Sequence, residues 1–378
     1  MKVLPGAVIL SSFDVMHFST RSVIVAALAG TFIIVISVIC FVSERPQKID
    51  SRLTNPSYLL EGILKSRTSV FLSPSFLPYV PKSSEALIPS IKEADAALAS
   101  TSAFFRLNRE KHFSIVLLDA HPASNHLAIG LLDSPLWVLA DVTPWGYLFR
   151  PIGSPAWHPP EPNQCFASWS SPSDMTLWLI GTASCLAAIK HLDEAKGLLE
   201  IAETTHSYPS LVLTGKASLA AQSGNWEESR RLAEESISKD RSNIPPRLIL
   251  IRSLIECGNS NDALTLARKL FDEHPKDIEV LFLYARAASS ANSNSEEIEA
   301  LLRLVNLLQD QKQPSGAALA YLAQAYAKNG RRSDALMSFQ KALNSPDMTD
   351  EQKHSIEEIM DHLMPAGKSS TPLPPLVR

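Results

Sequence analysis

Hydrophobic and small residues between positions 170 and 349 recur at intervals close to 34 residues. Placing Ala195, Ser229, Ala263, Ile298 and Ala335 in register gives spacings of 34, 34, 35 and 37 residues. A period of this length is typical of stacked helical hairpins, in which each unit packs only on its neighbours. We therefore predict helix pairs over residues 173–349. Because such stacks seldom carry out chemistry, the pattern also favours a binding function.

Each period resembles the tetratricopeptide repeat (TPR). Small residues stand where two helices cross, a glycine follows the first helix, and a proline ends the second. In the last unit these positions are Leu319, Leu322, Ala323, Tyr326, Gly330, Ala335, Phe339, Ala342 and Pro346. The fourth unit has no turn glycine, and we expect an extra residue within 292–295. The resemblance implies a mainly α fold, an α-solenoid of five hairpins closed by a capping helix over 350–364.

In TPR arrays, the second, fifth, ninth, twelfth and thirteenth positions of the first helices line a concave groove. The resemblance therefore implies a peptide-binding surface on these helices, which suits an extended or helical peptide. Its residues are Leu177, Ile180, Ser184, Leu211, Thr214, Ser218, Gln222, Leu248, Arg252, Glu256, Gln324 and Lys328. In the alternative interpretation, the leucines only pack one helix against another. Arg252 and Lys328 lie two repeats apart, unlike the basic clamp of chaperone adaptors.

A second pattern is the uncharged, apolar stretch from Ser22 to Ser43. At about 1.5 Å per residue it is long enough to cross a hydrocarbon core of roughly 30 Å. The residues after it do not form a good signal-peptidase site. We therefore predict an uncleaved transmembrane signal anchor at 22–43, preceded by an N-terminal stub at 1–21, within which Met16 is an alternative start.

The orientation of this anchor is weakly encoded. Lys2 and Arg21 precede it, and Arg45, Lys48 and Arg52 follow it, so the count of basic residues hardly favours one side. A short stub followed by a long chain favours an extracytoplasmic, periplasmic location for most of the protein. The opposite, cytosol-facing orientation stays open.

Composition narrows the class of function. The chain has 378 residues, a net charge of −4 and 20% charged residues, so it lacks the basic excess of nucleic-acid-binding proteins. Its four cysteines show no metal-binding spacing and no disulfide framework. We predict no metal site and no cofactor, and partners that are proteins or peptides, with the membrane contacted through 22–43.

Prolines divide the remaining sequence. Residues 44–83 and 151–172 are rich in proline and polar residues, which predicts a tether and a linker. Between them, residues 84–150 predict a small α/β domain: a helix over 84–110, a strand over 113–118, a short helix over 125–132 and a hairpin of 136–142 with 147–150. Residues 365–378 are expected to form a flexible tail.

The α/β segment contains Asp119, His121, His126 and Asp141 close to expected strand ends, where acid–base sites often lie. Ordinary turn chemistry explains the same residues, and no nucleotide-binding or hydrolase motif occurs. We therefore predict no catalytic residues. The order of these elements, with the run from Ser134–Trp137 to Leu148–Arg150, also resembles the small extracytoplasmic domains of bacterial glycosyltransferase-like membrane proteins, which indicates a location rather than an activity.

Together these patterns predict a membrane-tethered scaffold that assembles an envelope complex through its TPR groove. Two alternatives remain. The chain is an accessory subunit of a glycan-handling membrane enzyme, with a ligand-binding or catalytic α/β domain, or it is a membrane receptor whose repeats bind peptides in the cytosol.

Overall fold

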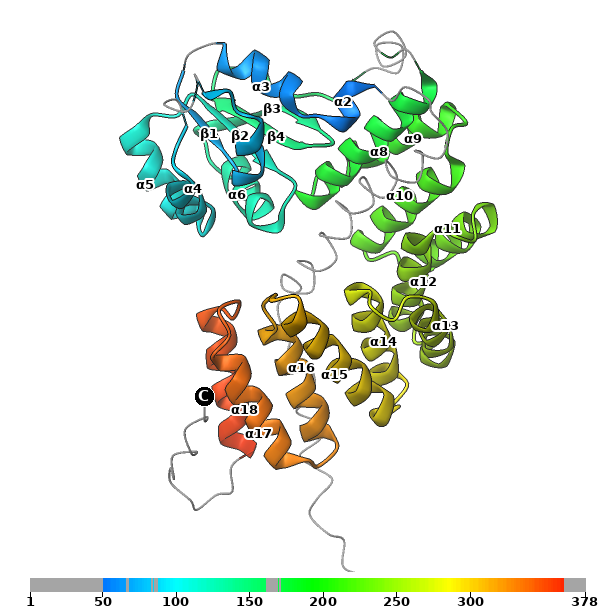
Figure 1. Ribbon diagram of the computed structural model, residues 1–378. Helices are drawn as coiled ribbons and strands as arrows, with labels where there is room; N and C mark the ends of the chain where they lie inside the picture. The colour runs from blue at the N-terminus through cyan, green and yellow to red at the C-terminus, as the bar shows by residue number, and fades with distance from the viewer. Residues whose placement is uncertain are drawn as a thin grey trace, which may run out of the picture. The chain divides into compact units, whose positions relative to one another are not determined.

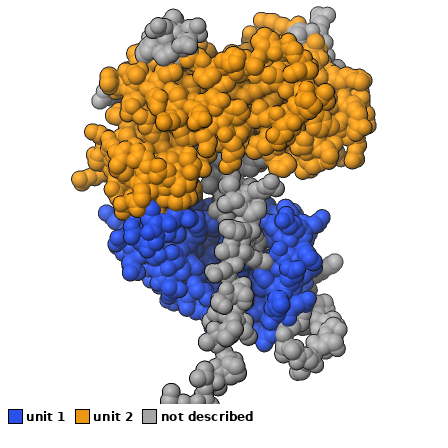
Figure 2. Space-filling model, turned by 180° about the vertical axis from the view of Figure 1, so that it is seen from behind, with its two compact units in different colours: residues 1–23, 254–378 blue, residues 24–253 orange. Residues whose placement is uncertain are grey.

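The computed structural model describes residues 50–65, 68–82, 84, 88–160, 169 and 171–363. The predicted stub, the signal anchor at 22–43 and the tail at 365–378 lie outside these ranges. Among the helices of the described ranges, none combines the length and apolar composition needed to cross a bilayer. The chain divides into two compact units (Figure 2). We call described residues 50–253 the N-terminal unit and 254–363 the C-terminal unit.

A four-stranded sheet begins the N-terminal unit (Figure 1). Its strands are β1 (Val70–Leu72), β2 (Ile115–Asp119), β3 (Trp137–Thr143) and β4 (Gly146–Pro151), in the order β1-β2-β4-β3. Strands β1 and β2 are parallel, whereas β4 is antiparallel to both β2 and β3. The strand and hairpin predicted between residues 113 and 150 are therefore present.

Helices cover both faces of the sheet (Figure 1). Around it lie α2 (Ser51–Thr54), α3 (Ser57–Leu64), the 3-10 helix η1 (Pro74–Tyr79), α4 (Ile91–Leu98), α5 (Thr101–Lys111) and α6 (Pro122–Leu132). On one face, Leu60 of α3 and Phe76 of η1 pack against the sheet. On the other face, Phe104 of α5 and Leu131 of α6 pack against Phe71. The sheet is thus buried on both sides.

Two expectations for this region differ from the structure. The tether predicted at 44–83 folds from Ser51 onward, because β1 finds a partner strand in β2, and α3 then buries its apolar side on the sheet. The single helix predicted over 84–110 is two helices. Ser90 and Ser100 each begin a helix by accepting a hydrogen bond from the backbone, and Ser90 forms a capping box with Glu93.

The repeat region contains ten helices that follow one another in five pairs, each joined by a short turn, and one more helix follows. They are α8 (Pro172–Ala188), α9 (Leu192–Thr204), α10 (Pro209–Gln222), α11 (Trp226–Lys239), α12 (Ile244–Glu256), α13 (Ser260–Glu273), α14 (Ile278–Ser290), α15 (Asn294–Asp310), α16 (Gly316–Lys328), α17 (Arg332–Leu343) and α18 (Asp350–Leu363). The boundary between the two units falls within α12. The predicted helical hairpins are confirmed.

The turn inside each pair is marked by one residue with positive φ. These residues are Lys190 (70°), Gly224 (75°), Gly258 (81°), Asn292 (57°) and Gly330 (71°). Asn292 replaces the glycine of the fourth unit, because asparagine tolerates the left-handed conformation better than most residues. The turn therefore keeps the 34-residue interval, and the extra length lies in α15, which has 17 residues where the other second helices have 12 to 14.

This register corrects the fourth unit. Five residues after each turn lie Ala195, Ser229, Ala263 and Ala335, all fully buried where two helices cross. The equivalent residue after Asn292 is Glu297, not Ile298 as the sequence pattern suggested. Glu297 is also buried, with 7% of its surface exposed. A carboxylate thus replaces a methyl or a hydroxyl at one crossing, and it requires a partner.

The first repeat helix is also part of the sheet domain. Buried residues of α8, among them Met175, Leu179 and Ala183, share one hydrophobic cluster with Phe71 and Phe149 of the sheet. A helix with apolar residues on all sides is typical of burial between two layers. Because α8 packs against the sheet and against α9, the α/β domain continues into the first hairpin without a separate interface.

The last helix closes the C-terminal unit. Ile356 and Met360 of α18 are buried, whereas Glu351, Glu358 and Asp361 are exposed. The outer face of α18 is therefore polar, as a terminal capping helix requires. In the preceding loop, the Asp347 carboxylate accepts hydrogen bonds from the backbone N–H groups of Gly316 (3.1 Å) and Ala317 (3.4 Å). This interaction fixes the start of α16.

Candidate peptide-binding surface

In the N-terminal unit, several predicted groove residues are used for packing. Leu177, Ile180 and Leu248 expose 7%, 7% and 8% of their surfaces. Ile180 lies in the hydrophobic cluster that α8 shares with the sheet, and the half-buried Leu211 packs against the same cluster. For these apolar positions, the interpretation as helix-to-helix packing fits the structure better than a role in binding.

Two of the polar groove residues of this unit form hydrogen bonds within the protein. Thr214 is buried, donates to the Ser210 carbonyl (2.8 Å) and lies 2.9 Å from the Ser236 hydroxyl on α11. The Ser184 hydroxyl donates to the Ile180 carbonyl on its own helix (2.9 Å). Ser218, Gln222 and Arg252 are half-buried. This part of the predicted surface offers few groups to a ligand.

The C-terminal unit presents a different set of side chains. Phe282 of α14 and Tyr321 of α16, both half-buried, meet edge to face with ring centroids 5.7 Å apart. They come from the first helices of two consecutive helical repeats. Aromatic rings in this arrangement provide a large apolar contact area with little side-chain entropy to lose on binding.

A cation lies beside these rings. Arg286 follows Phe282 by one helical turn on α14, and its Nη2 donates to Oε1 of Glu256 at 2.9 Å. The two side chains are 29% and 36% exposed. Burial raises the pKa of Tyr321, and the positive charge of Arg286 opposes this shift, so the guanidinium acts electrostatically on the phenol. Arg286 therefore belongs to the same local surface as the aromatic pair.

Lys328 at the end of α16 connects the two repeats that form this surface. Its Nζ donates to the carbonyl of Ser289 (3.3 Å) and to the Ser289 hydroxyl (3.4 Å) on α14. It also lies 3.5 Å from Oε2 of the buried Glu297. Lys328 thus supplies the counter-charge for the carboxylate at the helix crossing, and its side chain remains 37% exposed.

We call this set of residues the α14–α16 surface. It consists of Glu256, Phe282, Arg286, Ser289, Tyr321 and Lys328. The repeat pattern indicated Glu256 and Lys328. It did not indicate Phe282, Arg286 and Ser289, because the fourth turn has no glycine, and Tyr321 stands one place after the fifth position of α16. Asp277 was the available signal: its Oδ1 caps the start of α14 at Glu279 N (2.9 Å) and Val280 N (3.0 Å). Counting from that cap places Phe282 and Arg286 at the fifth and ninth positions.

Gln324, the remaining predicted residue on α16, is half-buried one helical turn before Lys328.

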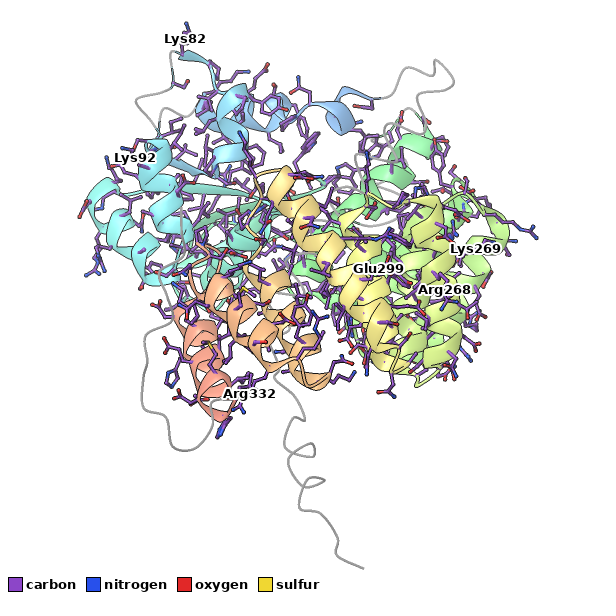
Figure 3. The ribbon with its side chains drawn as sticks, turned by 60° about the horizontal axis from the view of Figure 1, so that its bottom comes forward. Lys82, Lys92, Arg268, Lys269, Glu299 and Arg332 are labelled. Carbon is purple, nitrogen blue, oxygen red and sulfur yellow. The ribbon has the colours of Figure 1, made fainter. Side chains whose placement is uncertain are left out.

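A separate polar network joins the helices around α14. Arg268 of α13 (Figure 3) donates through Nη2 to Glu296 on α15 at 2.8 Å. The Tyr284 hydroxyl donates to the same carboxylate at 2.6 Å. This network holds α13, α14 and α15 together and so fixes the helix that carries Phe282 and Arg286.

The candidate acid–base residues of the sheet domain do not converge on one site. Asp119 accepts a hydrogen bond from Ser124 and acts electrostatically on Tyr147 and Cys185, on the face covered by α8. Asp141 instead interacts with Tyr58 of α3, on the opposite face, and burial raises the pKa of Asp141.

The two histidines add no such arrangement. The Nδ1 of His121 accepts from the Ala123 N–H (3.4 Å) at the start of α6. His126 is exposed on the same helix. Within the described residues, no cluster of potential metal ligands is formed.

No protein-family model and no curated protein sequence matches this chain. Solved TPR proteins are similar over about half of it. They include YrrB, described as having an unusual peptide-binding site, with 16% identity over 48% of this chain and 90% of YrrB and a TM-score of 0.39. TTC0263 of Thermus thermophilus is another, with 13% identity over 49% of this chain and 96% of TTC0263 and a TM-score of 0.40. A third is MamA of Desulfovibrio magneticus RS-1, with 14% identity over 47% of this chain and 94% of the MamA chain and a TM-score of 0.39. Similarity at this level carries no information about a ligand, so the TPR-like arrangement rests on the hairpins, turns and crossings described above.

Proposed function

We propose that this chain is a scaffold protein that binds a peptide segment of a partner on the α14–α16 surface. The observation that carries the proposal is the meeting of Phe282, Arg286, Tyr321 and Lys328 from two consecutive first helices. Apolar area with a few hydrogen-bonding groups suits an extended peptide, whose backbone supplies donors and acceptors along its length. The helices beneath are fixed by the Asp347 cap and the Arg268 network, so the surface is preorganised.

We further propose that the apolar segment 22–43 anchors this scaffold in a membrane, that the repeats lie outside the cytoplasm, and that the bound partner belongs to an envelope complex. The composition of 22–43 supports the anchor. The N-terminal unit begins only a few residues after this segment, at Asp50. Asp50 belongs to the folded unit, since it forms an ion pair with Arg52 (2.8 Å), whose guanidinium lies 3.7 Å from the centre of the Trp169 ring. Residues 44–49 can span at most about 20 Å at ~3.5 Å per residue, which would hold the unit near the bilayer.

Peptide binding is tested by selecting a random peptide library against the full-length chain in detergent. Selected peptides are then measured against the double variant Phe282→Ser, Tyr321→Ser. We expect at least a tenfold loss of affinity, because the aromatic contact area is removed. Met337→Ser is the matched control, since Met337 is an exposed apolar side chain (48%) on the second helix α17.

The outcome depends on where the selected peptides bind. Unchanged affinity in the double variant, with hydrogen exchange of α14 to α18 as in the wild type, would place binding elsewhere and reject this surface. Loss of affinity in Met337→Ser of the same size would point to a general effect on the fold.

The anchor is tested separately. Deleting residues 1–43 should release the chain from carbonate-washed membranes, and a phosphatase reporter fused after Arg378 should be active only if the repeats are exported. Continued membrane association of the deletion variant would place the anchor elsewhere. Activity of a cytosolic reporter at the same position would support the receptor alternative.

A further inference from the structure

The α14–α16 surface carries information about the charge of its ligand. The charge of the ligand matters only if this surface binds a peptide, as proposed above. Arg286 offers five N–H donors in its planar guanidinium. Within the described part of the chain its hydrogen bond runs from Nη2 to Glu256, so Nε and Nη1 keep donors available for a ligand. A guanidinium can hold one carboxylate on each of two edges.

The two cations of the surface differ in how they are held. Lys328 has three contacts of 3.3 to 3.5 Å, which bind it to Ser289 and to the buried Glu297. Removing it would leave a buried carboxylate without its counter-charge, so its main role is within the fold. Arg286 pairs with the more exposed Glu256, and a change there leaves no buried charge unpaired.

The aromatic pair lies beside Arg286. Phe282 precedes Arg286 by one turn on α14, and the Tyr321 ring meets Phe282 edge to face with centroids 5.7 Å apart. A ligand with a carboxylate next to an apolar residue could therefore engage Arg286 and the two rings at once. An amide or a basic residue would gain the ring contact without the charged hydrogen bond.

We propose that the α14–α16 surface selects an extended acidic peptide, in which a Glu or Asp side chain binds Arg286 and a neighbouring apolar side chain packs on Phe282 and Tyr321. Glu256 orients the guanidinium through Nη2, and the charge of Lys328 is balanced by Glu297. The occupant is a segment of a partner protein. The Arg286 donors that Glu256 does not occupy support this assignment, because a guanidinium binds carboxylates through strong charge-assisted hydrogen bonds.

Four labelled peptides test this selectivity by fluorescence anisotropy with the full-length chain in detergent. Each has three repeats of one tripeptide: Glu-Leu-Pro (acidic), Gln-Leu-Pro (neutral), Glu-Ser-Pro (acidic without the apolar residue) and Lys-Leu-Pro (basic). We expect the acidic probe to bind at least tenfold more tightly than the neutral and basic probes, and the Glu-Ser-Pro probe to bind more weakly than the acidic one. Raising the salt concentration should weaken the acidic probe most.

Arg286→Gln should remove most of the tenfold preference for the acidic over the neutral probe, and Arg286→Lys should retain part of it. The matched control is Arg303→Gln on α15. Arg303, like Arg286, pairs with one glutamate through Nη2, but its partner Glu299 lies on its own helix. The control should bind all probes as the wild type does.

Three results would overturn the proposal: equal binding of acidic and neutral probes, equal effects of Arg286→Gln and Arg303→Gln, or displacement of the acidic probe by a peptide of residues 364–378 at a lower concentration than by unlabelled acidic probe. The last would show that the chain itself supplies the occupant. If library selection yields ligands that need Phe282 and Tyr321 but have no acidic preference, only the charge assignment fails. If no peptide binds at all, the proposed function fails with it.

Discussion

The hydroxyl of Tyr147 on strand β4 lies 2.9 Å from the backbone carbonyl of Cys185 on α8 and 2.7 Å from Oδ1 of Asn125 on α6. Tyr147 is fully buried, and burial raises its pKa well above the ordinary value, so the phenol stays protonated and able to donate. This one side chain joins the sheet, its covering helix and the first repeat helix. The relationship explains why the sheet domain and the first hairpin form a single hydrophobic core.

Tyr147→Phe should lower the free energy of unfolding of the N-terminal unit by about 1–3 kcal/mol, because a buried oxygen acceptor loses its hydrogen-bond donor. Urea denaturation followed by tryptophan fluorescence measures this, since all six tryptophans precede residue 254. Tyr79→Phe is the control, because Tyr79 is 42% exposed and should change stability little. Equal values for both variants would argue against the joining role of Tyr147.

Gly181 permits close contact between α8 and the β3–β4 turn. A Cβ at this position would lie 2.7 Å from Cβ of Pro144, so Gly181→Ala should separate the helix from the turn and cost roughly 1–3 kcal/mol. Gly197→Ala on α9 is the matched control, since nothing lies within 4 Å of its Cβ position. It should stabilise the protein by up to about 1 kcal/mol through helix propensity. Opposite signs in thermal denaturation would support the close approach, and stabilisation by both variants would contradict it.

Asp347→Ala should destabilise the C-terminal unit by about 0.5–2 kcal/mol, because the first N–H groups of α16 lose their carboxylate acceptor. Hydrogen exchange should increase first at the start of α16. Asp361→Ala, an exposed acid in the last turn of α18, provides the comparison and should have little effect. Unchanged protection of α16 in Asp347→Ala would show that the cap is unimportant.

Ala335→Leu should overfill the crossing of α16 and α17, where Ala335 is fully buried, at a cost of roughly 1–3 kcal/mol. In a repeat array each unit touches its neighbours, so faster hydrogen exchange should be confined to α16, α17 and α18. The N-terminal unit should keep its protection. Uniform loss of protection in both units would mean that the chain unfolds as one cooperative body.

The Arg268–Glu296 network should make stability depend on pH. Hydrogen bonds from Arg268 and Tyr284 lower the pKa of Glu296 below its ordinary 4.5. Its stabilising contribution is therefore complete above the unfolded-state value and is lost as the pH falls through the folded-state value. Glu296→Gln should reduce stability at pH 7, and the difference from the wild type should shrink between about pH 5 and pH 3. A difference that stayed constant across this range would show that the charge of Glu296 contributes nothing.

Several features of this protein follow from local sequence alone. The hairpins, their turns near Gly224, Gly258 and Gly330, and the burial of Ala263 and Ala335 were predictable, because a helical repeat depends on contacts within one or two periods. The β3–β4 hairpin was predictable for the same reason, since a short turn sets its register.

The tertiary structure decided features that depend on distant contacts. Strand β1 has only three residues, in a proline-rich segment, and its partner β2 begins at Ile115, so the local sequence read as a tether. The role of α8 as a layer of the sheet likewise depends on Pro144 and Tyr147, which lie far from it in the sequence. The uncharged run from Met175 to Ile189 was a signal of burial on all sides.

The candidate site likewise combines features that the local sequence predicts with features that depend on the tertiary structure. The repeat pattern indicated that first helices carry the binding residues, but Asn292 in place of a glycine disguised the fourth turn, and the longer α15 displaced the apparent spacing. The structure fixed the turn by its backbone conformation. It thereby placed Phe282 and Arg286 of α14 beside Tyr321 and Lys328 of α16, and Glu297 at a crossing that elsewhere holds alanine or serine. Side-chain convergence of this kind arises from helix packing, which a one-dimensional period does not specify.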